Sequence, residues 1–131
     1  MRSAIRTDKA PQPAAAYEQA IVSGDLIFVA GQIANDSVTG AICTGPIEEQ
    51  VTQALRNIET IVVAAGGNRR TFVRCGVFLA DLNDFAAMNR AYSEFFGDSL
   101  PARTTVQVGL GSSLRVEIDA IAMRARKPRR T

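Results

Sequence analysis

The sequence predicts an α+β fold with the element order ββ-α-β-α-ββ, in which two helices cover one face of a mixed sheet. Two stretches repeat apolar residues at helical spacing, and five shorter stretches have the composition or the alternation of strands. The length of 131 residues is that of one domain, and 47% hydrophobic with 21% charged residues is ordinary for a globular protein. We therefore expect a single domain at residues 1–123.

The first elements are an irregular N-terminal segment and a hairpin. Residues 1–16 are rich in Ala and Pro, so we expect them to be irregular until they meet a sheet. Two β-forming runs follow, Ala20–Val22 and Leu26–Ala30, with a Ser-Gly-Asp turn between them. These runs predict an antiparallel pair of strands.

Two amphipathic helices are predicted downstream. The first lies between Pro46, which suits the first turn of a helix, and the Gly66-Gly67 pair, which ends one. Its apolar residues share one face: Ile47, Val51, Leu55, Ile58 and Val62. The second helix occupies residues 83–97, and its apolar residues also recur at helical spacing: Phe85, Met88, Tyr92, Phe95 and Phe96. We expect these aromatic side chains in the core rather than around a ligand.

Three further strands complete the predicted sheet. Residues 71–82 form the strand between the helices, and residues 103–110 and 114–123 form a closing hairpin around a Gly-Ser-Ser turn. Successive side chains of a strand point to opposite faces. With Leu110 opposite Leu114, the apolar sets of both strands lie under the helices. The other, open face then carries Arg103, Thr105, Gln107, Glu117 and Asp119.

The open face is the part of the predicted fold that can carry chemistry. Two helices cannot cover both faces of a sheet, so the open face is solvated or buried in a partner, and its apolar end favours a homo-oligomer. Arginine offers a planar fork for a carboxylate, and a neighbouring carboxylate side chain can activate water. Arg103 and Glu117 can therefore serve a small 2-oxo or 2-imino acid. Alternatively, both are surface residues, and Glu117 pairs with Arg115 or Gln107.

The composition excludes several kinds of site. The chain has no His, so it has no Ser-His or Cys-His catalytic pair and lacks the commonest metal ligand; we expect no metal. Cys43 and Cys75 form no CxxC pair, and no stretch resembles a membrane helix or a signal peptide. A reduced, cytoplasmic protein with no membrane partner is the expectation.

The C-terminal residues 124–131, RARKPRRT, differ in charge from the rest of the chain. They hold five basic and no acidic residues, whereas the rest has ten basic against thirteen acidic residues. We expect a disordered, solubilising tail, and nucleic-acid binding is the alternative.

Several motifs together resemble a known family. PARTTVQV, VEIDAIA, FVAGQIA, VFLADLNDFAAMNRAYSEFF and the helix that ends at Gly66 resemble the RidA/YjgF family of reactive-intermediate (enamine/imine) deaminases. The resemblance extends from about Ala10 to Met123. It implies a chorismate-mutase-like homotrimer with helices outside and three clefts between subunits.

The resemblance also implies an activity and its residues. In this family the arginine of Pro-Ala-Arg binds the substrate carboxylate and the glutamate of Val-Glu-Ile positions the hydrolytic water; here these are Arg103 and Glu117. Tyr17 and the Gly31 backbone match residues that line the cleft. The implied reaction is hydrolysis of 2-imino acids, in equilibrium with enamines, to 2-oxo acids and ammonia, as in 2-iminobutanoate/2-iminopropanoate deaminases. It needs no cofactor, and its partner is a small acid rather than a nucleic acid.

Departures from the family pattern leave the substrate open. Ala15-Ala16 stands where Gly-Pro is common, Ala30 where Ser is common and Thr105 where Cys is common. Ala30 and Thr105 are therefore candidate substrate-binding residues that differ from the pattern. A pathway-specific deaminase of an aminoacrylate or aminomuconate compound is one alternative. The others are a non-catalytic small-acid-binding or chaperone-like trimer and an RNA-associated or ribonuclease relative.

Overall fold

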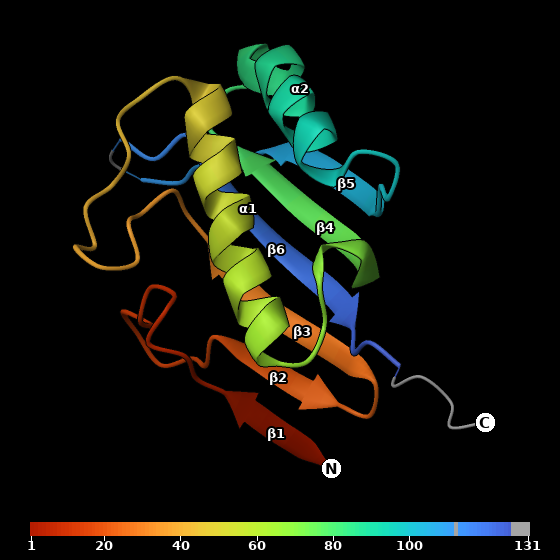
Figure 1. Cartoon of the computed structure of the whole chain (residues 1–131). Coiled ribbons are helices and arrows are strands. Elements are labelled where there is room, and N and C mark those ends of the chain that lie inside the picture. The colour runs from red at the N-terminus through yellow and green to blue at the C-terminus, as the bar shows by residue number, and fades with distance from the viewer. Residues whose placement is uncertain (112, 127–131) are drawn as a thin grey trace.

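The computed structural model describes residues 1–111 and 113–126. A six-stranded mixed sheet carries two helices on one face, which confirms the predicted α+β class (Figure 1). The strands are β1 (Arg2–Ile5), β2 (Ala20–Ser23), β3 (Leu26–Gln32), β4 (Phe72–Leu79), β5 (Ala102–Gln107) and β6 (Val116–Met123), and the helices are α1 (Ile47–Ala64) and α2 (Phe85–Phe96). Across the sheet the order is β1-β2-β3-β6-β4-β5.

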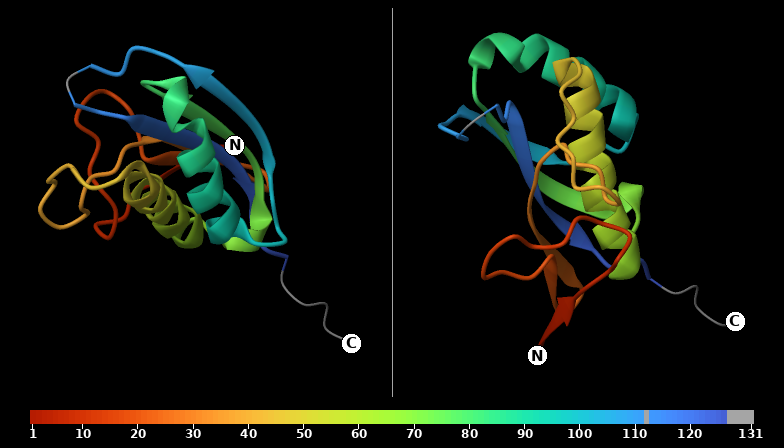
Figure 2. Two further views of the ribbon diagram at one scale, coloured as in Figure 1. Left: turned by 90° about the horizontal axis from the view of Figure 1, so that it is seen from above. Right: turned by 90° about the vertical axis from the view of Figure 1, so that its left-hand side faces the viewer.

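Helix α1 forms as its apolar pattern predicts. It begins one residue after Pro46, with two glutamates in its first turn, where the helix dipole favours negative charge. It ends before Gly66, whose φ of +97° is a conformation that favours glycine. Val51, Leu55, Ile58 and Val62 are completely buried. The predicted stripe therefore packs against the sheet, and Figure 2 shows from two directions that α1 lies on one face of the sheet.

Helix α2 contributes most of the aromatic part of the core. Met88, Tyr92, Phe95 and Phe96 are buried, as predicted, whereas Phe85 at the start of the helix is 40% exposed. The Phe96 ring contacts Phe72 of β4 edge-on, with ring centres 5.1 Å apart. This contact packs α2 against β4.

The N-terminal segment is more regular than predicted. Residues 2–5 form β1, an edge strand that pairs antiparallel with β2. The segment was expected to be irregular until it meets a sheet, but it joins the sheet already at residue 2. Because β1 lies at the edge and three of its four residues are exposed, its sequence needs no apolar alternation.

The predicted closing hairpin is wrong. β5 pairs in parallel with β4, and β6 lies between β3 and β4, antiparallel to both. β4, α2 and β5 form a βαβ unit, in which a helical crossover returns the chain in its original direction. The segment after β5 then passes the end of β4: the Val108 N–H donates to Leu79, and the Ala80 N–H donates to Arg115, each at 3.0 Å. The predicted Gly-Ser-Ser turn includes residue 112, which lies outside the described residues.

The strand register reverses part of the predicted face assignment. Arg103 stands beside Cys75, and Thr105 beside Val77, on the side of the sheet that the helices cover. Glu117 stands beside Phe78 on the other side, the open face. The prediction that Arg103 and Thr105 share the open face with Glu117 is wrong. Val106, which was expected under the helices, is on the open face and 38% exposed.

Two further observations concern the chain ends and the helices. Neither helix in the described part of the chain has the length and apolar character to cross a membrane. The predicted tail at residues 124–131 is described only as far as Arg126, and the remaining residues of the tail lie outside the described residues. The expected disorder of the tail stays a prediction.

Candidate functional site

Arg103 extends from the edge strand β5 toward α2. Its Nη1 donates a hydrogen bond to Oδ1 of Asn89 at 2.9 Å, and its Cζ lies 4.7 Å from the centre of the Tyr92 ring and 5.4 Å from that of Phe85. Arg103 is half-buried, and within residues 1–111 and 113–126 no salt bridge engages it. Among the described residues only neutral groups contact this cation, so its charge is available to an external anion.

A buried polar cluster lies beside Arg103. The Cys75 thiol is fully buried, and burial raises its pKa to about 11. Burial also raises the pKa of Tyr92 well above its usual value. The Tyr92 hydroxyl lies next to this thiol, but the two groups do not have the geometry of a hydrogen bond. In the described part of the chain, the buried hydroxyls of Tyr92 and Thr105 have no hydrogen-bond partner. Cys75 therefore stays a neutral thiol at pH 7 and is not an activated nucleophile.

Glu117 lies on the open face, directly over the backbone of Gly31. A Cβ at Gly31 would come within 2.6 Å of Oε2 of Glu117, so the carboxylate occupies this place only because residue 31 has no side chain. Gly31 lies in a bulge of β3, since Val29 pairs with Ala120 but Gln32 pairs with Ile118. The fold thus brings together two of the predicted site residues, Gly31 and Glu117.

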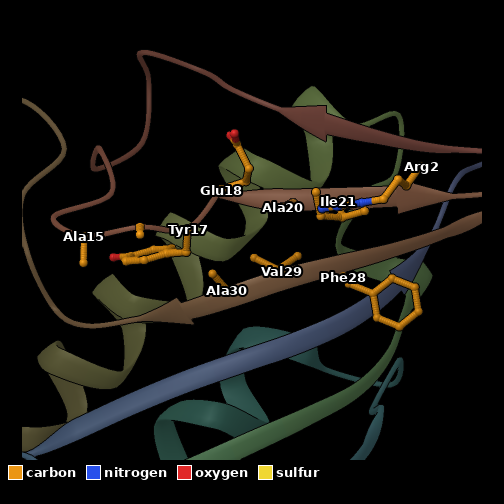
Figure 3. Close-up of a pocket in the computed structure, with 10 residues that line it drawn as sticks. Arg2, Ala15, Tyr17, Glu18, Ala20, Ile21, Phe28, Val29 and Ala30 are labelled. Atoms are coloured by element: carbon orange, nitrogen blue, oxygen red, sulfur yellow. The ribbon is translucent and has the colours of Figure 1, made fainter.

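Tyr17 and Ala30 line a groove at the β2–β3 end of the sheet. The groove has a volume of about 790 Å³, and Arg2, Ala15, Ala16 and Phe28 also line it. Figure 3 shows the Tyr17 ring beside Ala30. Tyr17 is 48% exposed. The three alanines that depart from the family pattern therefore lie around one groove, where small side chains leave space beside the tyrosine.

The predicted site residues fall into two groups on opposite sides of the sheet. Arg103 and Thr105 lie on the helix side, whereas Glu117 and Gly31 lie on the open face. Within one chain Arg103 and Glu117 therefore cannot contact the same small molecule. In the part of the chain that the structure describes, no three Cys, Asp or Glu side chains come together in a way that would hold a metal ion.

Two residues beside Arg103 were not predicted as part of the site. Tyr92 was predicted in the core, and it is only 2% exposed, yet its ring also contacts the guanidinium. Asn89 lies within the VFLADLNDFAAMNRAYSEFF stretch that carries the family resemblance, but no role was predicted for it. The sequence could have indicated Asn89 by its spacing. It lies three residues before Tyr92 and four after Phe85, so it shares their face of α2, and in a crossover unit this face lies toward the next strand.

A family model described as Endoribonuclease L-PSP matches residues 7–124. The chain belongs to this family. Its RidA/YjgF character, predicted from motifs, is confirmed by the YjgF gene product of E. coli, which superposes with a TM-score of 0.88 at 37% identity and covers 94% of this chain and 99% of that one. The structure of E. coli TdcF with bound serine matches equally well, with a TM-score of 0.88, 37% identity and the same coverage.

Curated relatives of this RidA/YjgF chain span almost its whole length. A RutC family protein from Pyrococcus horikoshii is 46% identical over 123 residues, which are 93% of this chain and 98% of that protein. The 2-iminobutanoate/2-iminopropanoate deaminase of Rattus norvegicus is 41% identical over 124 residues, which are 94% of this chain and 90% of that enzyme. These identities support deaminase-like activity.

Proposed function

We propose that this protein hydrolyses reactive 2-imino acids, and their enamine tautomers, to 2-oxo acids and ammonia. The observation that carries the proposal is the half-buried Arg103 guanidinium, which has only neutral contacts among the described residues. Such a cation favours a ligand carboxylate. The name of the rat relative supports an imino-acid substrate, and the serine bound to TdcF is a small molecule of the same carboxylate-bearing kind.

We infer that the complete site lies between neighbouring subunits of a homotrimer. Since Arg103 and Glu117 occupy opposite sides of one sheet, a small acid contacts both only when they come from two different chains. The open face supports assembly, because four large apolar side chains on it are 38–42% exposed: Leu26, Phe28, Val106 and Met123. A sheet face of this composition is normally buried in a partner.

In this arrangement Arg103 binds the carboxylate and Glu117 acts on water. Glu117 takes a proton from water as the water oxygen bonds to the imine carbon, and it passes this proton to the nitrogen. The resulting carbinolamine loses ammonia when the hydroxyl proton also reaches the nitrogen and the C=O bond forms. R–C(=NH)–COO⁻ and H₂O thus give R–CO–COO⁻ and NH₃. The imine carbon is already electrophilic, so orientation of the two reactants is the main requirement.

The first test compares Arg103→Ala with Glu117→Gln. The substrate is 2-iminopropanoate, generated in situ by an amino-acid oxidase, and its lifetime is followed by semicarbazide trapping. We expect both variants to lose the acceleration, but only Arg103→Ala to lose affinity for the product pyruvate, by about 10- to 100-fold. Unchanged turnover in Arg103→Ala would refute the proposal. Pyruvate binding by a wild-type protein that does not accelerate hydrolysis would instead identify a non-catalytic small-acid-binding protein.

A second test asks whether the two residues come from different chains. The inactive variants Arg103→Ala and Glu117→Gln are unfolded together, refolded as a mixture and assayed. If each site takes Arg103 from one chain and Glu117 from the next, about a quarter of the sites in randomly mixed oligomers contain both intact residues. We expect about that fraction of wild-type activity. No recovery, with mixed oligomers present, contradicts the two-chain site.

A further inference from the structure

Helix α2 holds the Arg103 guanidinium through two different contacts, one polar and one aromatic. We propose that Asn89 and Tyr92 are positioning residues that direct the Nε–Nη2 edge of Arg103 toward the substrate carboxylate. The proposal rests on the proposed function, because it concerns the orientation of the group that binds the substrate there.

Asn89 determines which edge of the guanidinium is free. The guanidinium is planar, and its five N–H groups point in fixed directions, so a bond at one nitrogen sets the directions of the others. Nη1 donates to Oδ1 of Asn89 at 2.9 Å and also lies 4.0 Å from Sδ of Met88. A carboxylate bound end-on, to Nη1 and Nη2, would share Nη1 with Asn89. The side-on fork of Nε and Nη2 makes no side-chain hydrogen bond within the described residues and is left for the ligand.

Tyr92 supports the guanidinium with its ring. The Cζ of Arg103 lies 4.7 Å from the ring centre, within the range of a cation–π contact. Tyr92 is only 2% exposed, and its ring packs against Phe96 with centres 4.8 Å apart. Phe96 in turn contacts Phe72 and Phe95. The ring is therefore part of a packed aromatic cluster and forms a rigid support, which lowers the ordering cost of binding.

Asn89 differs from Tyr92 in that the core does not need it. Its side chain is exposed, and its contact with Arg103 is the one side-chain hydrogen bond that it makes in the described part of the chain. It borders a depression of about 310 Å³, lined by Asn89, Tyr92, Ser93, Leu100, Pro101 and Arg103. A change at Asn89 is therefore expected to alter ligand binding and to leave folding intact.

The test is a double-mutant cycle on the assembled full-length protein. Asn89→Ala removes the acceptor and suits a helix. With Arg103 present, we expect it to weaken pyruvate binding, measured by calorimetry, about tenfold, and to raise KM for 2-iminopropanoate more than it lowers kcat. With Arg103→Lys, which keeps the charge but lacks Nη1, we expect Asn89→Ala to have no further effect.

Matched variants separate positioning from general damage. Tyr92→Phe keeps the aromatic ring and should keep pyruvate affinity, whereas Tyr92→Leu should weaken it as Asn89→Ala does. Arg90→Ala, an exposed change on the same helix, should bind pyruvate like the wild type. Methyl pyruvate has no carboxylate, so Asn89→Ala should not alter its binding.

The outcomes distinguish this inference from the proposed function. Wild-type pyruvate affinity in Asn89→Ala, with Arg103→Ala still inactive, overturns the positioning role and leaves the deaminase proposal standing. An equal loss on Asn89→Ala with Arg103 and with Arg103→Lys also overturns it, because the effect would not pass through the arginine. Full activity of Arg103→Ala overturns the proposed function itself.

Discussion

Replacing Gly31 with Ala perturbs the Glu117 carboxylate without changing Glu117 itself. The new Cβ would lie 2.6 Å from Oε2 and 3.0 Å from Cδ of Glu117, whereas ordinary contact begins at 3.4 Å. The carboxylate must therefore move by about 0.8 Å, the difference between these distances. A displacement of about 1 Å from a reactive geometry costs on the order of 100-fold in rate. We expect kcat for 2-iminopropanoate to fall by about that factor.

The same substitution should affect folding only slightly. Gly31 does not adopt a positive φ, and the atoms that a Cβ would meet belong to the far end of a flexible side chain. We expect the free energy of unfolding to change by less than about 1 kcal/mol. Pyruvate binding should remain, because Arg103 is untouched.

The assay compares imine hydrolysis and urea unfolding in Gly31→Ala and in Gly109→Ala. Gly109 is a suitable control because a Cβ there would meet no atom within 4 Å, and its φ is not positive. Gly109→Ala should behave as the wild type in both measurements. A wild-type kcat in Gly31→Ala would refute the reasoning that the position of the Glu117 carboxylate limits the rate.

Three other outcomes follow from the described residues. Phe28→Asp places a charge on the open face at a side chain that is 42% exposed, so it should lower the oligomeric state in sedimentation while the separated chain stays folded. At pH 8 iodoacetamide should modify half-buried Cys43 but not Cys75, whose pKa is raised by burial to about 11; mass spectrometry measures this, and rapid labelling of Cys75 would contradict its burial. Asn57→Ala removes an amide that donates to two loop carbonyls at 3.1 and 2.9 Å, so it should lower the free energy of unfolding by about 1–3 kcal/mol in urea titrations; a smaller loss would mean that water replaces the amide.

Helices and most strands could be predicted because burial imposes a period on the sequence. In α1 the buried stripe repeats at helical spacing, and Pro46 and Gly66 suit the two ends of the helix for separate stereochemical reasons. The sequence of β1 has no such apolar period, because its side chains are mostly exposed and the strand is held by backbone pairing with β2. Its position depends on its neighbour rather than on its own residues.

The side of the sheet on which Arg103 lies could not be predicted from alternation. Alternation identifies which residues of a strand share a face, but it does not say which face a helix covers. The expectation that apolar side chains lie under the helices fails in β5. Val106 is on the open face, whereas polar Arg103 and Thr105 are on the side that the helices cover. An edge strand tolerates this exchange, since it has a sheet neighbour on one side only and α2 supplies neutral partners to the guanidinium.

The strand order also explains why a deaminase site would depend on assembly. β5 is the last strand of the sheet, so Arg103 lies at the border where the helix layer ends and another molecule can approach. Glu117 lies on β6, between two other strands, and can be reached only across the open face. One chain therefore presents the carboxylate anchor and the water-activating group in different directions. Under the proposed function, burial of the open face would bring Arg103 of one chain and Glu117 of another together, so assembly and activity should be lost together in Phe28→Asp.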